Sequence, residues 1–120
     1  MSVCVAVTDN KEGQAALEAA TREAALLGVP LVVVNLTGAE IAGDLLVGSA
    51  PYEVVVPAGP ADADEVEQVL SVLDDRPEVT RLVVGVRPRS PIGKVLLGSI
   101  PQRLILEAQV PVLAVKSAHA

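Results

Sequence analysis

The hydrophobic positions of the chain fall into five short runs, and the segments between them show helical or turn-like patterns. The runs are rich in β-branched residues and predict five strands, at residues 3–7, 31–36, 52–56, 79–86 and 110–115. The second run is apolar except for Asn35 and lacks the alternation of a half-exposed strand. It therefore predicts a central parallel strand covered on both faces, whereas Pro111 in the last run suits an edge strand.

Helical spacing predicts three longer helices, at residues 11–27, 61–73 and 95–107. In the first, apolar residues recur on one face, namely Leu17, Ala20, Ala24 and Leu27. Gly28 followed by Pro30 marks the end of this helix. Asp62 or Asp64 is expected to cap the second helix. Between residues 37 and 50 three glycines leave room only for a short helix around 41–47.

Strands that alternate with helices predict an α/β fold, an open five-stranded parallel sheet with helices on both faces. At 120 residues the chain is expected to form one domain, residues 1–116, followed by a flexible tail at 117–120. Ligands of such sheets bind beyond the carboxyl ends of the strands, where the strand order reverses. The candidate segments are therefore 8–10, 35–37 and 85–99.

Composition removes several classes of function. Apolar runs reach about six residues, far below the roughly 18 of a membrane-spanning helix, and the N-terminal residues show no secretory signal. We therefore expect a cytoplasmic protein without membrane contact. The single Cys4 cannot form an intramolecular disulfide and is expected to be buried, and one aromatic residue, Tyr52, with a net charge of −6 argues against nucleic-acid binding. The only histidine, His119, lies near the end of the chain, so a classical nucleophilic triad is excluded.

Charge is distributed unevenly. Residues 1–78 hold three basic and fourteen acidic residues, whereas residues 79–106 hold five basic residues and no acidic one. Arg87, Arg89 and Lys94 belong to this basic segment, which ends at Gly98 and Ser99 before the last predicted helix. We expect Ser99 to be the N-cap there.

The unpaired amides at the start of that helix, with their partial positive charge, favour an anion. Gly85, near the end of the preceding strand, is expected to let a ligand approach the backbone. The segment therefore predicts a local anion site.

This segment resembles the C-terminal signature of the universal stress protein family, whose ATP-binding members carry G-x2-G-x9-G-[ST] after the fourth strand. Here the string reads Gly85-x2-Pro88-x9-Gly98-Ser99. Residues 110–115, Val-Pro-Val-Leu-Ala-Val, are similar to the last strand of the family, and residues 5–10, Val-Ala-Val-Thr-Asp-Asn, are similar to its first strand and loop. The resemblance covers most of the chain.

The resemblance implies a small regulatory module whose cleft between the first and fourth strands holds an adenine nucleotide, ATP, with Mg²⁺ as an accompanying ion. The residues that it places at this site are Thr8, Asp9, Leu36, Val84, Gly85, Arg87, Arg89, Gly98, Ser99 and Ile100. Leu36 and Val84 are expected near the adenine. Asp9 is open to two interpretations, a contact to nucleotide or Mg²⁺ and the N-cap of the first helix, of which the cap is favoured.

The resemblance also implies a homodimer, because the family often pairs through its last strand, here Val112, Leu113, Ala114 and Val115. Pro88 stands where the family has a glycine and Thr8 where ATP-binding members have an aspartate. These departures favour an alternative, a nucleotide-free scaffold that dimerises and binds a regulatory protein. No residue supplies a well-placed general base, so we assign no catalytic residue and expect at most slow ATP hydrolysis.

Overall fold

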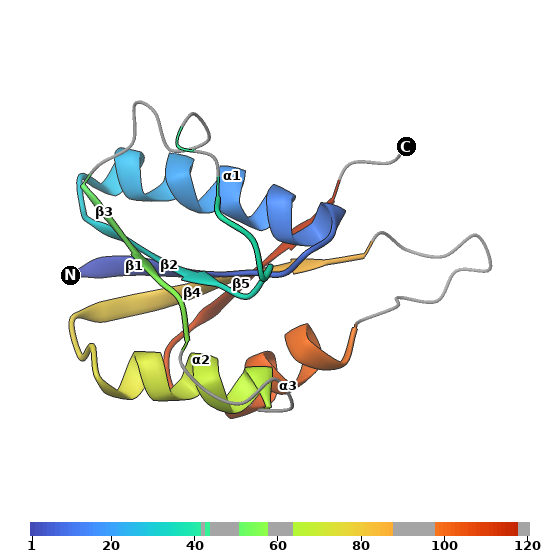
Figure 1. Cartoon of the computed structure of the whole chain (residues 1–120). Helices are drawn as coiled ribbons and strands as arrows, with labels where there is room; N and C mark the ends of the chain where they lie inside the picture. The colour runs from blue at the N-terminus through green and yellow to red at the C-terminus, as the bar shows by residue number, and fades with distance from the viewer. Residues whose placement is uncertain (42, 44–50, 58–63, 88–97, 118–120) are drawn as a thin grey trace.

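The computed structural model describes residues 1–41, 43, 51–57, 64–87 and 98–117. Its elements in chain order are β1 (Ser2–Val7), α1 (Lys11–Leu27), β2 (Leu31–Asn35), β3 (Tyr52–Val55), α2 (Glu65–Asp74), β4 (Val79–Val86), α3 (Ser99–Glu107) and β5 (Val112–Lys116). The strands form one parallel sheet in the order β3-β2-β1-β4-β5. The predicted α/β architecture is confirmed, with helices on both faces of the sheet (Figure 1).

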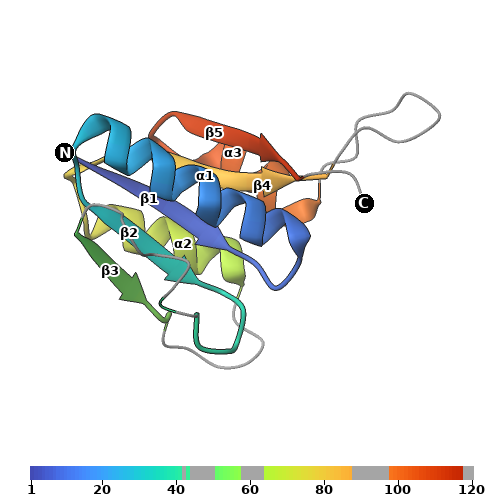
Figure 2. The same ribbon diagram turned by 90° about the horizontal axis from the view of Figure 1, so that it is seen from above.

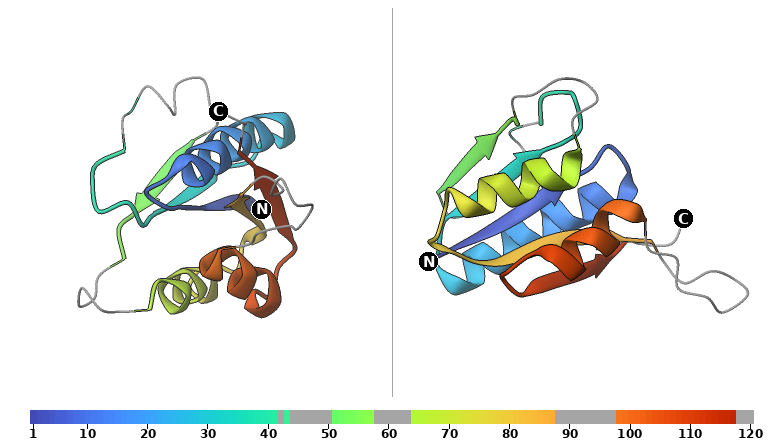
Figure 3. Two further views of the ribbon diagram at one scale, coloured as in Figure 1. Left: turned by 90° about the vertical axis from the view of Figure 1, so that its right-hand side faces the viewer. Right: turned by 90° about the horizontal axis from the view of Figure 1, so that it is seen from below.

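Alternation along β1 divides the core into two layers. Val3, Val5 and Val7 pack with the buried face of α1, whereas Cys4 and Ala6 pack with residues of α2 and α3. Seen from above, α1 lies across β1 and β4 (Figure 2), while α2 and α3 lie side by side under the sheet (Figure 3). All five residues of β2 are buried, which confirms the prediction of a central strand.

The N-cap of the first helix lies one residue later in the chain than the favoured candidate. Asn10, not Asp9, is the N-cap of α1, and its Oδ1 accepts a hydrogen bond of 2.8 Å from the backbone N–H of Gly13. The prediction that Asp9 caps the helix is therefore wrong: both residue types make good caps, and sequence alone does not fix the register. At the other end Gly28 takes a left-handed conformation with φ 67°, as predicted, but Leu27 is 42% exposed and does not share the buried face.

The other two helices differ at their starts. Asp64 caps α2, and its Oδ1 accepts hydrogen bonds from the backbone N–H groups of Val66 and Glu67. In α3 the N-cap is Gly98 in an extended conformation, and Ser99 is the first helical residue, so the prediction of a Ser99 cap is wrong. The predicted earlier starts of these helices, at 61–63 and 95–97, lie outside the described residues.

The edge strands of the sheet are β3 and β5. β5 begins at Val112 rather than at residue 110; the Pro111 carbonyl accepts a hydrogen bond of 2.9 Å from Leu82 N–H, but Pro111 has no N–H to donate in return. β5 pairs with β4 alone in the described chain, as predicted for an edge strand. In the predicted tail Ser117 is buried and donates from its N–H to the Val86 carbonyl, and residues 118–120 lie outside the described residues, as does most of the expected 41–47 helix.

Within the part of the chain that the structure describes, every helix is too short or too polar to traverse a lipid bilayer.

Candidate functional site

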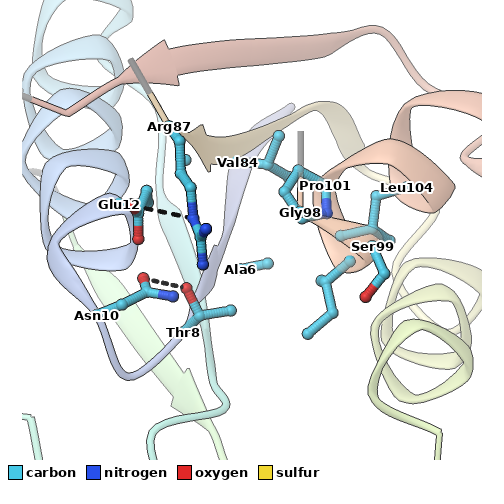
Figure 4. Close-up of a pocket in the computed structure, with 12 residues that line it drawn as sticks. Ala6, Thr8, Asn10, Glu12, Val84, Arg87, Gly98, Ser99, Pro101 and Leu104 are labelled. Atoms are coloured by element: carbon cyan, nitrogen blue, oxygen red, sulfur yellow. Dashed lines mark hydrogen bonds and ion pairs between the residues drawn. The ribbon is translucent and has the colours of Figure 1, made fainter. Parts of the chain in front are cut away.

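The strand order reverses between β1 and β4, since the chain runs outward from β1 to β2 and β3 and returns to β4 and β5 on the other side. A pocket with a volume of about 230 Å³ lies at this point, where parallel α/β sheets bind their ligands (Figure 4). Its lining comes from β1, the start of α1, the end of β4 and the start of α3: Ala6, Thr8, Asn10, Glu12, Val84, Gly85, Arg87, Gly98, Ser99, Ile100, Pro101 and Leu104.

Part of the lining is apolar and fixed by the core. Ala6 and Val84 point from β1 and β4 to the α2–α3 side of the sheet, and Leu104 of α3 is fully buried beside them. These side chains are part of the same cluster that holds α3 on the sheet. The pocket therefore has an apolar surface that cannot move without disturbing the core.

The start of α3 forms one wall of the pocket. Its first intrahelical hydrogen bond joins Gln102 N–H to the Gly98 carbonyl at 3.1 Å, and Pro101 has no N–H. The amides of Ser99 and Ile100 precede that bond, and the glycine N-cap offers them no side-chain acceptor. This wall therefore presents hydrogen-bond donors and the positive end of a helix dipole to the pocket.

The opposite wall comes from β1, α1 and β4 and carries the polar side chains. Figure 4 shows Thr8, Asn10, Glu12 and Arg87 gathered there. The Thr8 hydroxyl donates a hydrogen bond of 2.7 Å to Oδ1 of Asn10. The Arg87 Nε lies 3.8 Å from Oε1 of Glu12, an ion pair longer than a hydrogen bond.

Gly85 lines the pocket and also allows a close contact between β4 and α1. A Cβ atom at Gly85 would lie 1.9 Å from the backbone oxygen of Glu12, and one at Gly13 would lie 2.0 Å from the backbone oxygen of Thr8. The position that a side chain of residue 85 would take is thus filled by the first turn of α1. The two glycines let this turn pack directly on β1 and β4, and this close packing places Glu12 in the pocket.

Most of the predicted site residues lie together. Those that line the pocket are Thr8, Val84, Gly85, Arg87, Gly98, Ser99 and Ile100. Asp9 lines an adjoining depression with Glu40, and Leu36 packs against the core cluster under the sheet; neither is among the residues that line the pocket. Arg89 lies outside the described residues.

Asn10 lies in the candidate segment 8–10, whereas four other lining residues were not anticipated from the sequence: Ala6, Glu12, Pro101 and Leu104. Ala6 carries a usable signal, because alternation in β1 puts it on the same face as Cys4. Glu12 carries none, because its position depends on a contact between the first turn of α1 and Gly85, which is 73 residues further along the chain.

Cys4 takes no part in the pocket. Its side chain is fully buried in β1, and burial raises the pKa of its thiol to about 12. A thiol that stays protonated at neutral pH is a poor nucleophile, so the predicted packing role is consistent with its surroundings.

Comparison with known proteins identifies the family. A model of the universal stress protein family matches residues 61–116. Over 119 residues, 87% of this chain and 88% of the relative, the sequence is 36% identical to a universal stress protein of Mycolicibacterium smegmatis. The chain belongs to the universal stress protein family.

Solved structures of universal stress proteins share the fold. One from Archaeoglobus fulgidus superposes with a TM-score of 0.71 at 24% identity and covers 97% of this chain and 98% of its own. Another, described as a complex with cAMP, superposes with a TM-score of 0.63 at 19% identity and covers 98% of both chains. At these identities the likeness extends to the fold, including the order of strands that creates the pocket.

Proposed function

We propose that this universal stress protein is a regulatory module that binds an adenine nucleotide in the pocket between β1 and β4. The observation that carries the proposal is the pairing of two unlike surfaces in one pocket. Ala6, Val84 and Leu104 provide an apolar surface suited to a base or ribose. The N-terminus of α3 provides backbone donors suited to a phosphate.

The ligand class rests on the sequence and on one similar structure. The resemblance to ATP-binding members predicts ATP, and the structural neighbour described above was solved with cAMP. Both ligands share adenine, ribose and phosphate, so the proposal names that chemistry. The cytoplasm remains the proposed location, and the free, buried Cys4 is compatible with it.

Mg²⁺ remains a prediction tied to ATP. Asp9, the residue expected to contact it, is not among the residues that line the pocket, although its neighbours Thr8 and Asn10 are. Among the described lining residues Glu12 supplies the one carboxylate. A magnesium ion would therefore be held mainly by the phosphates of its nucleotide, as Mg²⁺ in nucleotide sites usually is.

Isothermal titration of the full chain with ATP, AMP and cAMP tests the proposal. Arg87→Ala is expected to weaken phosphate-dependent binding, because it removes the described cation of the pocket. Arg22→Ala is the matched control, since it removes an exposed arginine of α1 outside the pocket. Absence of heat with all three nucleotides at millimolar concentration would contradict nucleotide binding.

The second candidate function is a nucleotide-free scaffold that dimerises and binds a regulatory protein. One observation favours it: the carboxylate of Glu12 faces the pocket and repels phosphate. Pairing through β5 belongs to both functions, because β5 is an edge strand with Leu113 42% exposed. Sedimentation should give a mass of two chains for the wild type and one chain for Leu113→Lys; a wild-type mass of one chain at micromolar concentration would contradict pairing.

A further inference from the structure

The pocket contains a carboxylate next to its arginine. Among the described residues that line it, Glu12 and Arg87 are the two with charged side chains, so their charges cancel. The Glu12 side chain is 17% exposed, whereas that of Arg87 is 63% exposed. A nucleotide that reaches Arg87 therefore meets a half-buried negative charge at the same place.

The backbone of Glu12 is fixed at the edge of the pocket. The first turn of α1 rests against Gly85, where even a Cβ atom would be 1.9 Å from the Glu12 backbone oxygen. The turn is also anchored by the Asn10 cap. Glu12 therefore differs from an exposed glutamate such as Glu18, which lies on the same helix and outside the pocket lining.

The Glu12–Arg87 contact leaves donors for a ligand. At 3.8 Å the two groups form an ion pair without hydrogen-bond geometry, and Figure 4 shows the guanidinium extending past Glu12 toward Thr8. A phosphate that accepts hydrogen bonds from the start of α3 faces Arg87 and Glu12 on the opposite wall of the pocket. Further phosphates add negative charge beside a carboxylate in a partly desolvated pocket, where repulsion is stronger than in water.

We propose that Glu12 selects ligands by charge, so that the pocket prefers adenine nucleotides with one phosphate group over those with three. This inference rests on the proposed function, because it concerns which nucleotide the same pocket takes. Glu12 is a specificity-determining residue, because its carboxylate lines the space that the ligand would occupy.

The test compares AMP and ATP, which differ only in the number of phosphates, by titration in EDTA. The wild type is expected to bind AMP more tightly than ATP. Glu12→Gln keeps the shape and removes the charge, and should raise the affinity for ATP about tenfold or more while changing that for AMP less than about threefold. Adding Mg²⁺ should narrow the wild-type difference, because the ion offsets phosphate charge.

Glu18→Gln is the control, since it changes the net charge by the same amount. The ratio of AMP affinity to ATP affinity in this variant should equal that of the wild type. Glu12→Ala is the second variant, and should shift the ratio in the same direction; thermal melts check that each variant folds. Equal shifts for Glu12→Gln and Glu18→Gln, or an unchanged ratio in both Glu12 variants, would overturn the inference and leave nucleotide binding standing. No binding of either nucleotide to wild type or variants would overturn both.

Discussion

Two helices begin at the same pocket, and they begin in opposite ways. At α1 the Asn10 side chain accepts from Gly13 N–H and also from the Thr8 hydroxyl, so the helix satisfies its own first turn. At α3 the N-cap is Gly98, which has no side chain to offer. The difference teaches that one helix end is built for stability and the other is left for an external acceptor.

The same contrast extends to charge. The first turn of α1 carries Glu12, which interacts favourably with the helix dipole, whereas the first turn of α3 carries no acidic residue. The α1 side therefore supplies the negative charge of the pocket, and the α3 side offers an uncompensated positive helix end. A phosphate is expected on the α3 side.

The largest effect is expected from Gly85→Ala, which disrupts the packing of the first turn of α1 on β4. The new Cβ would overlap the Glu12 carbonyl, so α1 must shift off β4. We expect a loss of about 2–3 kcal/mol or more in the free energy of unfolding, which lowers Tm by about 10 °C. At Gly98 a Cβ would meet its nearest atom, Pro101 Cδ, at 3.4 Å, so Gly98→Ala should melt close to the wild type; similar melting of both variants would contradict the comparison.

Gly98→Asp would make the start of α3 resemble that of α1. Its backbone, with φ −64° and ψ 162°, suits an aspartate N-cap, which would accept from the amides of α3 and repel phosphate. We expect a small gain in stability, a few tenths of a kcal/mol, with nucleotide affinity reduced more than about tenfold. Gly98→Asn is the uncharged control and should lose less affinity. Unchanged titrations for Gly98→Asp would show that the ligand does not use this helix end.

Asn10→Ala should reduce stability by about 1 kcal/mol, because α1 loses its capping acceptor. Tm is expected to fall by about 4 °C in a calorimetric scan. Asp9→Ala is the matched control, since Asp9 is exposed and does not cap the helix. If Asp9→Ala were the more damaging of the two, the cap assignment would be wrong.

The smallest effect concerns the contact between α2 and α3. Arg103 donates hydrogen bonds to Asp64 at 2.7 Å and to Glu107 at 3.0 Å. The bond to Asp64 holds the pKa of that carboxyl below its usual range. The stabilisation that ionised Asp64 gives the folded protein is fully present above the ordinary aspartate pKa. It is lost as the pH falls below that value and through the lowered pKa. Arg103→Met should move the Asp64 pKa up toward its ordinary value, which carboxyl NMR titration can follow, with only a slight change in Tm. A Tm change as large as that of Asn10→Ala would contradict a surface role.

Sequence patterns predicted the layers of the fold better than the ends of its helices. The run at 79–86 matches β4 residue for residue, because a β-branched run bounded by polar residues has one reasonable alignment. The bounds predicted for α1, residues 11–27, are confirmed, but Asp9 and Asn10 are equally good caps, so the favoured N-cap was one residue too early. Ser99 is a better intrinsic cap than Gly98, but Gly98 has the extended conformation of an N-cap and Ser99 is already helical.

The pocket was predictable where it follows local motifs and hidden where it follows contacts. Thr8 could be placed because it follows β1, and Gly98 and Ser99 because they lie at the start of α3. The position of Leu36 after β2 did not reveal that it lies outside the pocket lining, since its packing beneath the sheet depends on the core cluster around it. Glu12 depends on Gly85 across the fold, and no pattern of neighbours along the chain encodes that contact.

The pairing of β1 with β4 has a consequence for synthesis on the ribosome. Thr80 Oγ1 donates to the Ser2 carbonyl across 78 residues, and β4 follows β1 only after more than half of the chain. Until β4 emerges, the edge of β1 that pairs with it is open. The pocket is also incomplete, because β4 and α3 supply part of its lining. Such distant pairing slows folding and exposes strand edges to misassembly, so a nascent chain is expected to acquire ligand binding late and all at once.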